Sequence, residues 1–169
     1  MAGRPNPLDR YLKDVAPGRL EWIGLRSARR GPLATPGEAE AIAGAGLAGD
    51  HRAGKASTSG RQVTIISREF IDQIGHFLGV GPIEPGLLRR NLVVSGLNLH
   101  AARHQRIRVG AALLEPNALC HPCLRMEEAL GPGAVAAMYG HGGLCCRVVE
   151  GGTLRLGDAV SLGPRSTGD

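Results

Sequence analysis

The stretch that decides the fold is LCCRVVEGGTLRLGDAVSL, residues 144–162. Apolar and β-branched residues dominate 144–150, 153–156 and 159–162, which predicts three short strands. Gly151-Gly152 separates the first two strands and is a strong signal for a two-residue hairpin turn. Gly157-Asp158 marks a second turn before the last strand. Short strands this close together favour an all-β or mostly β architecture.

Further strands are expected in the rest of the chain, at residues 20–26, 38–47, 61–66, 92–96, 105–109 and 111–115. One clear helix should follow Ser67, a good N-cap, and end at Gly79, a good left-handed C-terminal residue. Its core-facing side is predicted to comprise Phe70, Ile71, Ile74, Phe77 and Leu78.

Many short strands with few helices favour a closed or nearly closed β-barrel with helical inserts, a mostly β (α+β) fold. We expect a loosely held N-terminal arm over residues 1–17, a single domain over 18–163 and a C-terminal tail over 164–169.

The amino-acid composition limits the kinds of ligand and partner that this protein is expected to bind. The chain has 169 residues, enough for one domain with a real core, and 26 glycines and 11 prolines argue against a helical bundle. Its net charge of +5 comes almost entirely from arginine, since Lys13 and Lys55 are the only lysines. The arginines are scattered and aromatic residues are few, so we expect a small anionic ligand and no nucleic acid polymer.

Targeting signals are not evident. Residues 1–16 contain no apolar signal-peptide core, and no stretch approaches the roughly 18 apolar residues of a membrane span. We therefore expect a cytoplasmic protein that makes no use of a membrane, with its four cysteines present as reduced thiols.

The chemistry is expected around NALCHPC, residues 117–123, where Cys120 and Cys123 lie between an apolar run and a helix-prone segment. A thiol at such a strand-to-helix junction can meet helix N-terminal amides, which lower its pKa and favour the thiolate. Three alternatives stay open: a small buried hydrophobe, half of a structural zinc site, or a thioredoxin-like redox pair. The adjacent Cys145 and Cys146 have poor spacing for the other half of a zinc site.

Two other segments are candidates for anion binding. Arg89-Arg90-Asn91 precedes a predicted strand and could grip an anion, or could be a pair of solvated charges. The glycine-rich loop 49–60 carries His51, Arg52 and Lys55, and could be an anion-facing lip that moves over a pocket, or a solvated linker.

A set of motifs resembles the MOSC domain, named for the C-terminal domain of molybdenum-cofactor sulfurase. The matching stretches are GLAGDH (46–51), RQV (61–63), RRNLVVSG (89–96), CHPC (120–123), GGLCCRV (142–148) and GGTLRLGDAV (151–160). They fall in the family's order and cover roughly residues 20 to 162. No N-terminal β-barrel partner domain and no aminotransferase-like sulfurase domain accompanies them, so the resemblance is to the small stand-alone bacterial members.

The resemblance implies a mostly β barrel with a pocket for the molybdenum cofactor. The family's hallmark cysteine matches Cys123, which ligates molybdenum in reductase relatives and is thought to carry persulfide sulfur in sulfurase relatives. The family's cofactor-contacting Arg-x-Asn matches Arg89 and Asn91. We expect the cofactor site to be completed by Arg61, Arg90, Arg147 and Asp50, with His51 facing it as a catalytic residue. The family is also associated with pyridoxal phosphate, which no residue of this chain supports.

The implied function is reduction of N-hydroxylated (N–O) small molecules, as some stand-alone members are linked to detoxification of N-hydroxylated bases. A sulfur carrier that uses a cysteine persulfide and a non-enzymatic cofactor-binding module are the alternatives. The chain has no Gly-x-Gly-x-x-Gly fingerprint and no cysteine spacing for an iron–sulfur cluster, so electrons should come from a separate electron-transfer protein. Arg26 and Arg165 are expected to lie outside the site.

Overall fold

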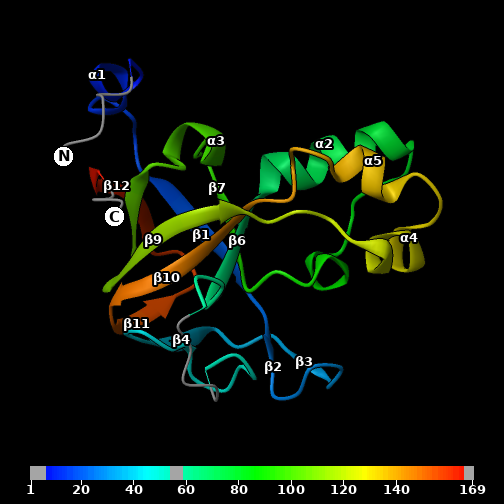
Figure 1. Ribbon diagram of the computed structural model, residues 1–169, viewed down its shortest axis with the longest axis horizontal. Coiled ribbons are helices and arrows are strands. Elements are labelled where there is room, and N and C mark those ends of the chain that lie inside the picture. The colour runs from blue at the N-terminus through cyan, green and yellow to red at the C-terminus, as the bar shows by residue number, and fades with distance from the viewer. Residues whose placement is uncertain (1–6, 54–58, 166–169) are drawn as a thin grey trace.

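Seven strands close into a barrel in the computed structural model, which describes residues 7–53 and 59–165 (Figure 1). Their order around the barrel is β1, β12, β8, β9, β10, β6 and β7. The bounds are Gly18–Ile23 (β1), Val63–Ser67 (β6), Leu92–Ser95 (β7), Gln105–Val109 (β8), Ala112–Leu119 (β9), Leu144–Glu150 (β10) and Ala159–Arg165 (β12). The predicted closed, mostly β barrel is confirmed.

The remaining elements decorate this barrel. Two small sheets lie beside it: β11 (Gly152–Arg155) with β4 (Glu38–Ile42) and β5 (Gly46–Leu47), and β2 (Leu25–Arg26) with β3 (Leu33–Ala34). The helices are α1 (Asp9–Leu12), α2 (Arg68–Leu78), α3 (Leu99–Ala102), α4 (Leu124–Leu130) and α5 (Ala134–Met138), with a 3₁₀ turn η1 (Pro85–Leu88). None of the helices in the described part of the chain combines the length and the apolarity that a membrane crossing requires.

Strands β6 and β7 are the one parallel pair in the barrel, and a parallel pair needs a crossover connection. Helix α2 and η1 supply it. Helix α2 begins as predicted, because the Ser67 hydroxyl accepts a hydrogen bond from the Phe70 amide at 3.1 Å. It ends at Gly79, whose φ of 65° is left-handed.

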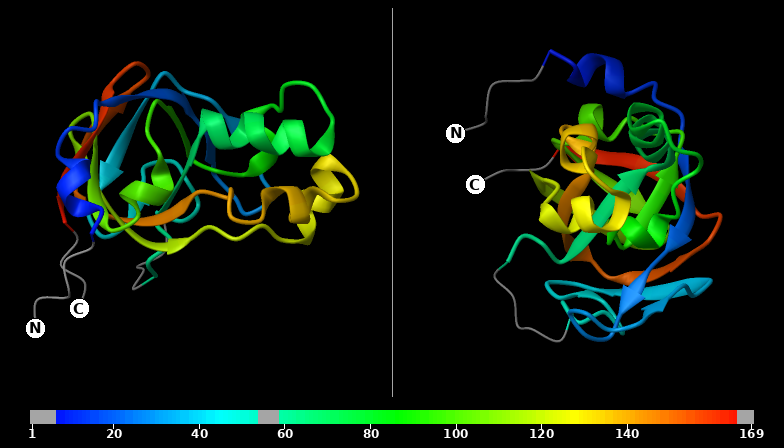
Figure 2. Two further views of the ribbon diagram at one scale, coloured as in Figure 1. Left: turned by 90° about the horizontal axis from the view of Figure 1, so that it is seen from above. Right: turned by 90° about the vertical axis from the view of Figure 1, so that its right-hand side faces the viewer.

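Two apolar cores result from this crossover. The first fills the barrel, and includes Leu20, Ile65 and Leu114. The second lies between the outer face of β6–β7 and helices α2, α4 and α5, and includes Ile66 and Met126. Both faces of β6 are therefore buried, which explains its unbroken β-branched run. Figure 2 shows these helices gathered on one side of the barrel.

The predicted core side of α2 is only partly right. Ile71 and Ile74 are buried, and Phe70 and Leu78 pack against the cores, but Phe77 is 59% exposed. Phe77 instead makes an edge contact with the His141 ring, at 5.8 Å between centroids.

The hairpin predicted at Gly151-Gly152 is wrong. β10 pairs with β9 and β6, whereas β11 pairs with β4 in a different sheet. At Gly151 the backbone passes so close to the Ala41 carbonyl that a Cβ would lie 2.7 Å from it. The glycines therefore let the chain cross from the barrel to the neighbouring sheet, and do not form a tight turn.

Other boundaries also differ from those predicted. The strand expected over residues 38–47 is a hairpin, β4 and β5. β12 continues to Arg165, beyond the expected end at Leu162. The Arg165 guanidinium meets the Asp9 carboxylate of α1 at 2.6 Å, so the end of the last strand holds the start of the chain.

Candidate functional site

Cys123 lies at the boundary of two neighbouring cavities. Strand β9 ends at Leu119, three residues without regular secondary structure follow, and Cys123 is then the N-cap residue of α4, with an extended backbone. Its thiol makes no capping hydrogen bond, and the residue is exposed. The larger cavity has a volume of about 830 Å³ and the smaller about 410 Å³, and they share Cys123, Arg89 and Arg125. The predicted strand-to-helix position of the thiol is thus observed.

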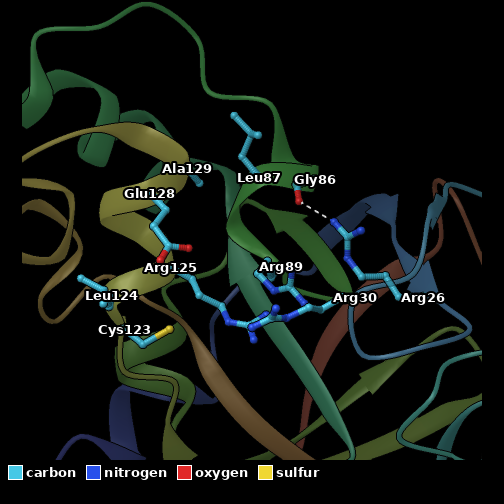
Figure 3. Close-up of a pocket in the computed structure, with 10 residues that line it drawn as sticks. All are labelled: Arg26, Arg30, Gly86, Leu87, Arg89, Cys123, Leu124, Arg125, Glu128 and Ala129. Atoms are coloured by element: carbon cyan, nitrogen blue, oxygen red, sulfur yellow. Dashed lines mark hydrogen bonds between the residues drawn. The ribbon is translucent and has the colours of Figure 1, made fainter.

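Eight arginines surround this thiol, contributed by six separate parts of the chain. They are Arg26 of β2, Arg29 and Arg30 of the β2–β3 turn, Arg52 after β5, Arg61 before β6, Arg89 and Arg90 after η1, and Arg125 of α4. Figure 3 shows the Arg30, Arg89 and Arg125 side chains converging on one region beside the Cys123 sulfur. Among the residues that the structure describes, Glu128 is the only carboxylate that lines either cavity.

No carboxylate within the described residues forms an ion pair with any of these eight arginines. Elsewhere in the described residues, five arginines form ion pairs with carboxylates, as Arg106 does with Glu115 at 2.9 Å. Guanidinium groups gathered without counter-charges repel one another and attract anions. The cavities are therefore suited to a small ligand with phosphate or carboxylate groups.

Arg89 has an unusual backbone. Its φ of 58° makes it the one non-glycine residue with a positive φ in the described part of the chain. This left-handed residue ends η1 and turns the chain into β7. Partial burial is the main cause that lowers the pKa of Arg89, and repulsion from Arg26 and Arg125 lowers it further. A strained residue held among like charges is typical of a ligand site.

Arg90 faces the opposite way, into the protein. Its guanidinium donates to the carbonyls of Gly142 and Leu88, each at 2.7 Å, and of Cys120 at 3.3 Å. Burial lowers its pKa. Although Arg90 lines the smaller cavity, it is 95% buried, and its contacts tie together η1, the turn before β10 and the segment after β9.

Asp50 and Asn91 form a buried network behind the cavities. The Asn91 amide oxygen accepts from the backbone and hydroxyl of Thr64, and its nitrogen donates to the Gly24 carbonyl and the Asp50 carboxylate. Asp50 also accepts from the backbone amides of Arg26 and Arg52, both at 3.1 Å. Neither residue lines the two cavities around Cys123. Their contacts fix the segments that carry the arginines.

His51 lines the smaller cavity. Its Nδ1 lies 3.2 Å from the Arg26 carbonyl oxygen and 3.5 Å from the Asp50 carboxylate. An Nδ1–H donated to that carbonyl leaves Nε2 as the nitrogen free to exchange a proton. The lip predicted for residues 49–60 is observed in part, since His51 and Arg52 line the cavity, while residues 54–58, including Lys55, lie outside the described residues.

Cys120 has a different environment from Cys123. It is buried, and Nη2 of Arg61 donates to its sulfur at 3.4 Å. A hydrogen bond from the Cys145 thiol lowers the pKa of Cys120, and the charges of Arg90 and Arg61 add to that effect. The same hydrogen bond raises the pKa of Cys145, and burial raises that of Cys146. Cys120 is therefore the thiol that its surroundings favour as thiolate.

A close backbone approach fixes Cys120 in place. A Cβ on Gly142 would collide with the Cys120 carbonyl oxygen. The Cys120 amide also donates to the Gly143 carbonyl at 2.8 Å, so Gly142 and Gly143 hold Cys120 from both its amide and its carbonyl.

The structure separates the expected site residues into three groups. Cys123, His51, Arg61, Arg89 and Arg90 line the cavities, whereas Asp50 and Asn91 lie behind them. Arg147 lies elsewhere, on β10, where its guanidinium meets the Glu115 carboxylate at 2.8 Å.

Sequence reasoning missed several cavity residues. Arg29, Arg30, Arg125 and His121 were not singled out, and Arg26, expected outside the site, lines the larger cavity. The Arg29-Arg30 pair resembles the Arg89-Arg90 pair in composition, which was the one available signal.

The fold and this site define a small β-barrel protein with a positively charged cavity beside an accessible thiol. A family model described as the MOSC domain matches residues 48–161, and the chain belongs to that family. The family is associated with molybdenum-cofactor binding and related activity.

Solved structures share the fold. The chain is similar to YuaD from Bacillus subtilis, with a TM-score of 0.77 and 22% identity over 90% of this chain and 98% of that one. It is also similar to YiiM from Geobacillus stearothermophilus, with a TM-score of 0.68 and 16% identity over 90% of this chain and 78% of that one. YiiM from Escherichia coli gives a TM-score of 0.66 and 18% identity, covering 89% and 72%. A search of curated protein sequences finds no significant match.

Proposed function

We propose that this protein binds the molybdenum cofactor in the arginine-lined cavities and reduces N-hydroxylated small molecules with electrons from a separate redox protein. One observation carries the proposal: an exposed thiol, Cys123, lies where two cavities meet, among arginines that have no carboxylate partners.

The donor set fits this cofactor. The described residues contain no group of three or more His, Cys, Asp or Glu side chains placed to hold a metal ion. A site with one thiolate and many guanidinium groups suits a metal that arrives already chelated by an anionic organic ligand. The organic part of the cofactor is such a ligand, because its dithiolene binds molybdenum and its phosphate carries negative charge.

The residues in and behind the cavities have different roles in the proposed function. Cys123 supplies the protein's ligand to molybdenum, which is soft toward thiolate. Arg89, Arg61 and Arg52 bind the phosphate, while Arg90, Asn91 and Asp50 hold the segments that carry them. His51, with Nδ1 occupied, exchanges a proton through Nε2. When bound, the cofactor supplies the two-electron redox chemistry.

The proposal is tested with protein produced in a host that makes the cofactor, and with protein from a cofactor-deficient strain as the control. We expect molybdenum near one atom per chain in the first case only. The loaded protein should reduce benzamidoxime, a neutral N-hydroxylated compound, with reduced viologen and not with NADH or NADPH alone. Full molybdenum occupancy without turnover would favour a binding module, and efficient turnover on NADPH would remove the need for a partner protein.

A sulfur carrier is the second candidate, favoured by the exposure of the Cys123 thiol beside a positively charged cavity. Mass spectrometry after incubation with a persulfide donor separates the two. A stable gain of one sulfur atom at Cys123, in protein that retains no molybdenum, would support the carrier.

A further inference from the structure

The larger cavity has one charged side and one apolar side. Arg30, Arg89 and Arg125 face it from the charged side, and Leu87 and Ala129 lie on the other, while Leu124 lies apart from them beside Cys123 (Figure 3). Leu87 on the apolar side is 43% exposed, so it is open to a ligand in the cavity.

Two of the three arginines on this side have guanidinium groups without a partner among the described residues. The side chains of Arg30 and Arg125 make no hydrogen bond or ion pair with any described residue, in contrast to that of Arg26, which donates to the carbonyls of Gly31 and Gly86. Among the described residues that line this cavity, Glu128 carries the only negative charge.

The smaller cavity already has enough arginines for a phosphate. It is lined by Arg29, Arg52, Arg61 and Arg90 besides the two shared arginines. Once a cofactor phosphate is bound there, the positive charge of the larger cavity remains unbalanced. A ligand for the larger cavity should therefore bring a negative charge together with an apolar body.

We propose that the larger cavity is a substrate subsite for amphipathic organic anions, with a carboxylate on the arginine side and an aromatic or alkyl body against Leu87 and Ala129. The assignment rests on the proposed reductase function, since it makes the substrate an N-hydroxylated compound of this class. For an amidoxime, two one-electron donors and two protons from solvent convert the C=N–OH group to C=NH. The N–O bond breaks, an N–H bond forms, and the oxygen leaves as water.

Binding is measured first, by calorimetry on cofactor-free protein, with three probes: 4-carboxybenzamidoxime, neutral benzamidoxime and acetate. We expect the carboxylated aromatic probe to bind roughly tenfold or more tightly than either of the others, since a charge-assisted contact contributes on the order of 1.5–3 kcal/mol. Equal affinity for the neutral probe, or for acetate, would overturn the assignment.

Variants locate the site. Arg30→Gln should weaken binding of the carboxylated probe roughly tenfold, because Arg30 lines only this cavity. Arg155→Gln, which neutralises an exposed arginine paired with Glu38, should leave the affinity unchanged. Thermal unfolding of both variants verifies folding. Equal affinities in Arg30→Gln and the parent would overturn the subsite.

Turnover distinguishes the two hypotheses. With molybdenum-loaded protein, a lower KM for the carboxylated amidoxime than for benzamidoxime, lost in Arg30→Gln, supports both. Equal KM values with normal turnover would overturn the anionic substrate and leave the reductase standing. Arginine-dependent binding without molybdenum or turnover would support the anion subsite and overturn the reductase.

Discussion

Two adjacent arginines illustrate two regions of this molecule that are built in opposite ways. Arg90 is buried, and each of its three donor contacts ends on a backbone carbonyl. Arg89 is only partly buried, has a left-handed backbone, and uses one donor on the Arg29 carbonyl at 2.8 Å. The same contrast separates Cys120, buried under hydrogen bonds, from Cys123, open to the cavities.

The contrast shows how a residue's partners reveal its role. Within the described residues, every buried side-chain nitrogen and oxygen has a hydrogen-bond partner, as expected of a structural region. The arginines of the cavities lack carboxylate partners, whereas several arginines elsewhere have them, for example Arg106 and Arg147 with Glu115. Charge left unpaired at a cavity is available to a ligand.

The largest expected effect is at the two cysteines. Cys123→Ser should abolish molybdenum retention, because a hydroxyl is a poor replacement for a soft thiolate ligand. Cys120→Ser should reduce molybdenum retention much less, since Cys120 is buried behind the cavities and has only a supporting role. The measurement is molybdenum per chain after purification from a cofactor-producing host. Equal molybdenum in Cys123→Ser and the parent would show that the contrast between the two thiols has no functional meaning.

The two arginines should separate stability from binding. Arg90→Met leaves three buried carbonyls without donors and should lower the free energy of unfolding by about 3 kcal/mol. Arg89→Gln should leave stability nearly unchanged, yet weaken cofactor binding roughly tenfold. Urea unfolding and cofactor titration measure the two quantities. A similar loss of stability in both variants would contradict the division into a structural and a ligand-binding arginine.

The smallest expected effect is a pH dependence from Cys120. Its pKa in the folded protein is about 6, mainly because of the Cys145 hydrogen bond, against roughly 8.5 for an unfolded cysteine. Because the folded pKa is the lower one, the thiolate stabilises the fold fully above the unfolded pKa, and this stabilisation is lost as the pH falls through the folded pKa.

The comparison is between the parent and Cys120→Ser, by urea unfolding at pH values from about 6 to about 8.5. The difference in unfolding free energy should grow with pH, by on the order of 1–2 kcal/mol. A difference that stays constant over this range would mean that Cys120 remains a thiol.

The local elements were predictable where a few neighbouring residues decide them. The β-branched run before Ser67 gives β6, the Ser67 hydroxyl begins α2, and Gly79 ends it. The change from strand β9 to helix α4 was also predictable, and it places Cys123 at the N-cap of α4. These outcomes depend on backbone preferences and on hydrogen bonds within a few residues.

Strand pairing was less predictable. Gly151-Gly152 has the composition of a hairpin turn, yet β11 joins β4, more than a hundred residues earlier. Tertiary packing overrode a local signal, because glycine serves a close backbone crossing as well as it serves a turn.

By itself, the sequence determined a mostly β barrel, a thiol at a strand-to-helix junction and an excess of arginine, because local propensities and composition fix these properties. Only the tertiary structure decided which arginines gather around that thiol. Arg30 and Arg125 are 95 residues apart by their numbers and reach one cavity only because the barrel closes and α4 packs beside it. Barrel register likewise places Arg147 opposite Glu115, where its charge is paired, and leaves Arg89 facing the cavity, where no carboxylate pairs with it.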